Sequence, residues 1–174
     1  VKAKKFELIT QFSRFNDLPS KIDSIYTPQE SFTGGLLTKL NLPGNIQLSG
    51  QAGVSLHTRD KNSATLDTTF SIQGIEPGDL GMTPRISSRV DYAYQYNILI
   101  PVKFLRFIYQ RDYRGPGFRS LGTPYLRNDI LKDIYRANIN LFKGRFFTTL
   151  MYLSQENNLN NEKESQTVMD NYSI

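Results

Sequence analysis

Residues that could carry chemistry are few in this chain. It contains no cysteine and one histidine, His57, among 174 residues. The lack of cysteine excludes disulfides, thiolate metal sites and thiol nucleophiles. A metal site or an acid–base pair at His57 would need a second suitable partner, and the sequence offers only Arg59 and Asp60 beside it. We therefore expect a plain polar-face histidine, and we predict no catalytic residue, no metal site and no cofactor.

A second candidate site is a glycine-rich segment flanked by arginines. Arg114 precedes Gly115-Pro116-Gly117, and Arg119 follows two residues later. Successive backbone N–H groups in such a turn can form a nest that binds an anion such as phosphate. The alternative is an ordinary turn in a solvated loop. We name Arg114, Gly115, Gly117 and Arg119 as the anion-binding candidates.

The elements that must position these residues are β-strands, because apolar and polar residues alternate with period two. In 46–57 the even positions are apolar or small, and the odd positions carry mainly Gln, Ser and His. The segments 32–42 and 86–98 alternate in the same way, and weaker examples complete the set. The expected strands cover residues 5–15, 32–42, 46–57, 86–98, 103–113, 129–141, 146–155 and 166–174.

One of these segments has two interpretations. Read as a strand, 129–141 places Leu131, Tyr135 and Ile139 opposite polar neighbours. Read as a helix, it begins at the cap Asp129 and ends at Gly144. We favour the strand.

The connections between the strands alternate in length. Short turns are expected at 43–45, around Ile100-Pro101, and at 142–145. Long polar loops are expected at 16–31, 59–85, 114–128 and 156–165. All short turns then lie at one end of the sheet and all long loops at the other, as in outer-membrane β-barrels. This requires 66–74, which also alternates, to be an extra strand or an arm outside the membrane.

Strand length, the polar opposite face and aromatic content favour a bilayer over a soluble fold. Strands of about 10–13 residues match the 9–11 that a tilted crossing of the hydrocarbon requires. Tyr and Phe are dense in 86–98 and 103–113, as expected of aromatic girdles. Asp133 falls on the expected lipid face, where it is tolerable only near the outer rim. We predict an all-β, antiparallel, up-and-down transmembrane barrel of about eight strands, forming one domain or part of a larger barrel.

In this fold, charged residues on the polar side of the strands would face the lumen. They could set the ion preference of a pore, or they could pair across the interior and plug it. The lumen-lining candidates are Arg89, Asp91, Arg106, Asp112 and Arg136.

Several segments resemble one known group. Residues 28–60 with the stretch Leu-Ser-Gly-Gln-Ala-Gly-Val-Ser-Leu-His, then 83–89, 114–129 and the final hairpin around 157–159, look like large outer-membrane β-barrel proteins of Gram-negative bacteria. The resemblance implies an outer-membrane location and a larger parent. The start without Met and the ending Asn-Tyr-Ser-Ile fit a fragment.

We therefore expect a non-enzymatic outer-membrane protein that acts as a pore, a transport component or a surface scaffold. Its expected partners are membrane lipid and, through the loops, lipopolysaccharide or other envelope proteins. The net charge of +5 is too small to favour nucleic acid. Two alternatives are a soluble, secreted β-sandwich and a lipocalin-like barrel whose aromatic residues line a pocket.

Overall fold

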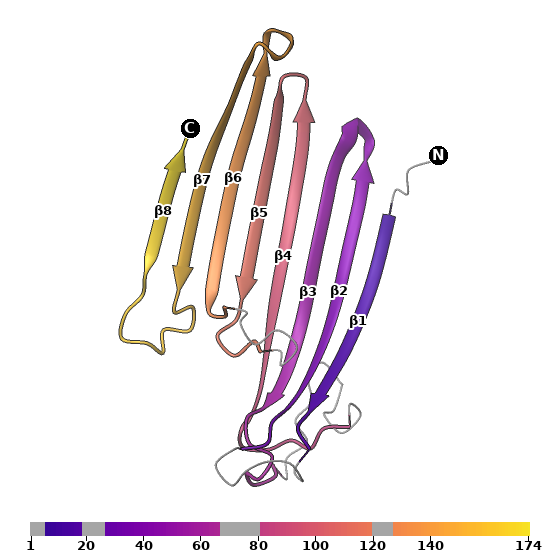
Figure 1. Ribbon diagram of the computed structural model, residues 1–174, viewed down its shortest axis with the longest axis vertical. Helices are drawn as coiled ribbons and strands as arrows, with labels where there is room; N and C mark the ends of the chain where they lie inside the picture. The colour runs from indigo at the N-terminus through magenta and orange to yellow at the C-terminus, as the bar shows by residue number, and fades with distance from the viewer. Residues whose placement is uncertain (1–5, 19–26, 67–80, 120–126) are drawn as a thin grey trace.

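The computed structural model describes residues 6–18, 27–66, 81–119 and 127–174. These residues form one sheet of eight antiparallel strands, arranged in the order of the sequence (Figure 1). The strands are β1 (Phe6–Asn16), β2 (Glu30–Leu42), β3 (Ile46–Thr58), β4 (Ser88–Val102), β5 (Leu105–Arg114), β6 (Ile130–Leu141), β7 (Phe146–Asn157) and β8 (Val168–Ser173). The predicted all-β, up-and-down arrangement is confirmed.

The period-two pattern located each strand to within a few residues. The ambiguous segment is strand β6, and the helical interpretation of 129–141 is wrong. β6 pairs with β5 through ten residues and with β7 through twelve, from Ile130↔Asn157 to Leu141↔Phe146. This pairing provides hydrogen-bond partners for the backbone N–H and C=O groups of β6 on both sides. The weak local preference for a helix is not strong enough to compete with it.

The connections alternate as expected. The turns after β2, β4 and β6 lie together at the upper end of the sheet in Figure 1, and the strand ends that lead into the long loops lie at the lower end. One short turn was misplaced: Ile100 and Pro101 belong to β4, and the turn is formed by Lys103 and Phe104. β4 pairs with β3 only as far as Leu99, so the missing N–H of Pro101 costs no hydrogen bond with that strand.

Most of the alternating segment 66–74 lies outside the described residues. β3 and β4 are nevertheless direct neighbours, from Gln47↔Leu99 to Thr58↔Ser88. No other strand therefore lies between them in the sheet. Thr65 and Arg85 form an isolated antiparallel bridge. It lies close to the points where the described residues end, at 66, and resume, at 81.

The sheet is open within the described residues, since β1 and β8 each pair on one side only. A closed barrel is therefore not formed by these residues alone. They also form a single layer, whereas a β-sandwich would bury Val54 and Tyr92 between two sheets. These side chains are 44% and 52% exposed.

Candidate functional site

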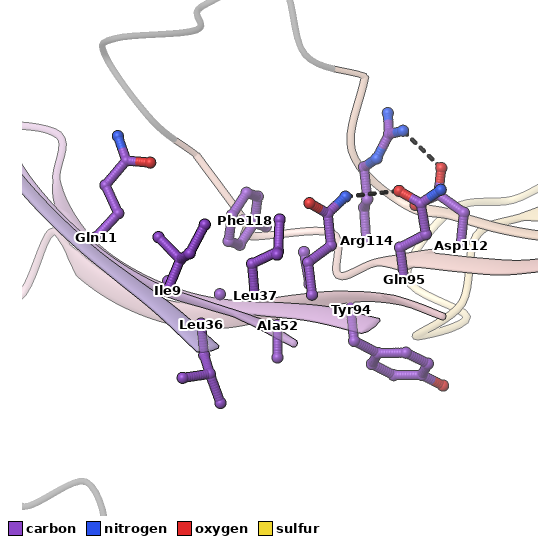
Figure 2. Close-up of a pocket in the computed structure, with 14 residues that line it drawn as sticks. Ile9, Gln11, Leu36, Leu37, Ala52, Tyr94, Gln95, Asp112, Arg114 and Phe118 are labelled. Atoms are coloured by element: carbon purple, nitrogen blue, oxygen red, sulfur yellow. Dashed lines mark hydrogen bonds and ion pairs between the residues drawn. The ribbon is translucent and has the colours of Figure 1, made fainter. Parts of the chain in front are cut away.

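The two faces of the sheet differ in chemistry, and the register assigns every strand residue to one of them, because directly paired residues share a face. One face, here the polar face, carries Gln51, Gln95 and Asp112, which are linked through consecutive pairs. The other, here the tyrosine face, carries Ala52, Tyr94 and Tyr113. Figure 2 shows Gln95 and Asp112 projecting from one side of the sheet, and Tyr94 and Leu36 from the other.

All five lumen-lining candidates lie on the polar face. Arg89 and Asp91 alternate along β4, Arg106 is opposite Pro101, Asp112 is opposite Gln95, and Arg136 is opposite Ile108. They do not form one cluster: Arg89 and Asp91 lie towards the long loops, whereas Arg106 lies beside a short turn. Asp112 pairs with Arg114 at 2.6 Å.

The glycine-rich segment folds over this polar face. We call residues 114–119 the inward loop. Gly115 N–H donates to the Tyr92 carbonyl at 3.0 Å, and Phe118 is 8% exposed with its ring above Gly53. Ser55 hydrogen-bonds the backbone of Arg119. The loop therefore covers the ends of β3 and β4 rather than extending into solvent.

The inward loop holds a carboxylate of the chain itself through one backbone N–H group. Gly117 N–H donates to Asp91 Oδ2 at 2.7 Å. A Cβ on Gly115 would overlap the same carboxylate, so a larger residue here would force the Asp91 side chain to move. Of the four anion-binding candidates, Gly115 and Gly117 surround Asp91, Arg114 pairs with Asp112, and the Arg119 side chain is exposed.

Beside the inward loop the polar face is hollowed. A cavity of about 320 Å³ extends from Ile9 and Leu37 to Asp112 and Arg114, with Phe118 over it (Figure 2). Within it, Gln51 Nε2 donates to Gln95 Oε1 at 2.6 Å. The hollow is thus lined by amides, an ion pair and a few apolar side chains. The period-two pattern gave no signal for the contribution of Phe118, because that residue lies in a loop.

The tyrosine face carries a continuous aromatic row across β4 to β8. Ring centroids lie 4.7 Å apart for Tyr109 and Tyr135, 5.9 Å for Tyr135 and Tyr152, and 4.9 Å for Tyr152 and Tyr172. The full set, here the tyrosine row, is Tyr92, Tyr94, Tyr96, Tyr109, Tyr113, Tyr135, Tyr152 and Tyr172. Such offset and edge contacts stabilise neighbouring strands.

Asp133 lies on the tyrosine face, as the sequence indicated, and it is paired there. Arg111, directly opposite on β5, donates through Nε at 2.8 Å and through Nη2 at 2.7 Å. Tyr109 Oη donates to the same carboxylate at 2.9 Å. A bidentate guanidinium and a phenol together balance this charge on the tyrosine face.

Two of the long loops are joined just before the start of β6. Asp129 forms an ion pair with Lys163 and accepts the Leu159 N–H at 2.9 Å. Burial of Asp129 alone would raise the pKa of its carboxyl, but the Lys163 ammonium and the Leu159 N–H outweigh burial and lower it. The Asn158 side chain also bonds the Lys163 backbone. The segment 158–165 is thereby anchored.

Comparisons with protein-family models, with curated proteins and with solved structures give no match. The part of the chain that the structure describes holds no group of three or more His, Cys, Asp or Glu that could bind a metal. It contains no helix with the length and apolar character of a membrane span.

Proposed function

We propose that this sheet is the wall of an outer-membrane β-barrel, with the tyrosine face towards lipid and the polar face towards a lumen that the inward loop narrows. In this proposal the protein is a non-enzymatic pore or transport component of the bacterial outer membrane. The same faces would serve a surface scaffold if the lumen were filled.

The observation that carries this proposal is the order of side chains along β5, β6 and β7 on the tyrosine face. Nearest the short turns are apolar residues, including Phe107, Ala137 and Leu150. Tyr109, Tyr135 and Tyr152 follow, and Arg111 and Asp133 come next, ahead of Tyr113 and Leu131. Apolar side chains thus lie nearest the short turns, and tyrosines mixed with charged side chains lie towards the long loops, as expected of hydrocarbon and of an interface on the long-loop side.

On β2 to β4 the apolar stretch reaches further towards the long loops, to Phe32, Leu56 and Val90. Strands in a barrel are tilted, so a plane parallel to the membrane cuts neighbouring strands at different residues. The stagger between β3 and β6 therefore supports the proposal.

Exposure of apolar side chains supports it further. Large side chains of the tyrosine face remain open to the surroundings of the sheet. They include Phe6, Leu8, Phe12, Leu36, Val54, Tyr92, Ile100, Phe146, Leu150, Val168 and Tyr172. Exposed apolar side chains in this number are unfavourable in water and favourable against acyl chains.

Membrane fractionation of the full-length product, followed by gel electrophoresis with and without heating, tests the proposal. We expect the protein in the outer-membrane fraction, with migration that changes on heating because a closed barrel resists detergent. A water-soluble protein whose migration ignores heating would support the soluble alternatives instead.

A further inference from the structure

Buried polar atoms without partners gather at one point of the polar face, next to the inward loop. His57 is 5% exposed and Ser31 is 0% exposed, and the two are direct partners across β2 and β3. Within the described chain, both ring nitrogens of His57, the Ser31 hydroxyl and the Thr33 hydroxyl have no hydrogen-bond partner. Buried polar groups are normally paired, so this group points to a bound species.

Neighbouring buried hydroxyls show that the region is otherwise well satisfied. Thr58 Oγ1 lies 2.8 Å from Ser88 Oγ, and Ser55 bonds the backbone of Arg119. Four of the six buried side-chain atoms without a partner in the described residues belong to Ser31, Thr33 and His57, and the other two are Arg85 Nε, just before β4, and Asn97 Oδ1, farther along β4. Ser31, Thr33 and His57 form a contiguous patch, because Thr33 is two residues from Ser31 on the same face.

The charge around this patch is positive. Arg89 is the direct partner of His57 on β4, and the guanidinium groups of Arg119 and Arg59 lie close enough to act electrostatically on the His57 ring. In the described part of the chain, none of these three arginines has a carboxylate within ion-pair distance. The nearby acid, Asp91, is already held by Gly117 N–H and Tyr92 N–H.

We propose that Ser31, His57, Arg89 and Arg119 form an anion site that takes the phosphate group of a small solute. The hydroxyl and the imidazole N–H supply neutral donors, and the guanidinium forks supply charge-assisted ones. The Gly117 N–H does not bind the solute, because it already holds Asp91. The side chains of Arg89 and Arg119 are exposed at the long-loop end of the sheet, so a solute can contact them from that side, whereas Ser31 and His57 are buried.

The experiment uses the one histidine as its own reporter. The full-length protein, labelled with ¹³C-histidine and folded in neutral detergent, is titrated with inorganic phosphate at constant pH and ionic strength, with chloride as the balancing salt. We expect saturable shifts of the His57 ring resonances with phosphate and none when chloride alone is varied. Equal effects of both salts would indicate screening of the arginines and would overturn the proposal.

Two variants and a matched control locate the site. Arg89→Gln and Arg119→Gln each remove charge-assisted hydrogen bonds and are expected to weaken phosphate binding about tenfold or more. Arg106→Gln lies on the same face beside a short turn, and we expect no change in affinity. Equal affinity in all four proteins would contradict the assignment.

A second experiment distinguishes the phosphate of a soluble molecule from the phosphate of a lipid headgroup. Doping the detergent with phosphatidylglycerol should leave the His57 resonances unchanged, because the site faces away from the tyrosine face. Shifts caused by the lipid alone would overturn the solute assignment. The titration measures phosphate binding in detergent, whereas fractionation tests the membrane location. A negative result in one experiment is therefore distinguishable from a negative result in the other.

Discussion

Arg111 holds Asp133 by two parallel hydrogen bonds, Nε to Oδ1 at 2.8 Å and Nη2 to Oδ2 at 2.7 Å, across β5 and β6. The side chains are 33% and 15% exposed, on the face that also carries the tyrosine row. Each charge therefore depends on the other, since neither has full access to water.

This pair is expected to show strong coupling in a double-mutant cycle. Arg111→Gln and Asp133→Asn should each destabilise the protein, and the double variant should lose less than the sum, with a coupling free energy of about 1–3 kcal/mol. Urea unfolding in lipid vesicles measures each value. Strictly additive losses would show that the pair contributes nothing specific.

The contact between Asp129 and Lys163 predicts a pH dependence of stability. The pKa of Asp129 is lowered in the folded state, so the stabilisation is fully present above its ordinary value of 3.8. It is lost as the pH falls below 3.8 through the lowered folded value. Asp129→Asn should lower the unfolding free energy at neutral pH and make it less sensitive to acid.

Unfolding at pH 7 and at pH 3 in wild type and Asp129→Asn provides the comparison. Lys163→Met, which removes the ammonium from the other side, serves as the matched variant and should reproduce most of the effect. If the unfolding free energy falls equally from pH 7 to pH 3 in wild type and in Asp129→Asn, the acid sensitivity arises from other carboxyls.

The turn between β6 and β7 carries backbone strain. Phe142 and Lys143 have φ values of 54° and 57°, in the left-handed region where a side chain is unfavourable. Lys143→Gly should therefore stabilise the protein by roughly 0.5–1 kcal/mol. Lys103→Gly is the control, because Lys103 lies in the turn after β4 and has no positive φ. An unfolding midpoint raised equally by both substitutions would point to lost charge instead.

The hydrogen bond between Gly117 and Asp91 holds the inward loop. Asp91→Ala removes it, and Gly115→Ala places a methyl group against the same carboxylate. Both should release the loop and speed tryptic cleavage after Arg119, whereas Gln95→Ala, on the same face of β4, should not. If cleavage is unchanged in Gly115→Ala, the loop is held by other contacts.

The strands were predictable because each has two chemically different faces, and alternation in 46–57 or 86–98 follows directly from that difference. The turn after β4 was misplaced because Pro101 resembles a breaker, although it lies beyond the pairing with β3. Helix signals at Asp129 and Gly144 were overridden by pairing on both sides of β6. Local propensity cannot report such tertiary pairing.

The candidate site was only partly predictable. Alternate residues of a strand share a face, so the register alone assigns the five lumen-lining candidates to one side of the sheet. They are Arg89, Asp91, Arg106, Asp112 and Arg136. That the Gly117 N–H would hold Asp91 could not be inferred, because this contact depends on the fold of 114–119 across the sheet. The burial of His57 beside Ser31 depends in the same way on the pairing of β2 with β3.

Which face of the sheet contacts lipid can be measured directly, because the chain has no native cysteine. Spin labels are placed at Leu150→Cys and Ile98→Cys on the tyrosine face, and at Gln95→Cys and Arg136→Cys on the polar face. In vesicles, collisions with oxygen report lipid and collisions with a polar nickel complex report water. The proposal predicts high oxygen and low nickel accessibility at the first two positions and the reverse at the other two. Water-accessible labels at Leu150 and Ile98 would contradict it.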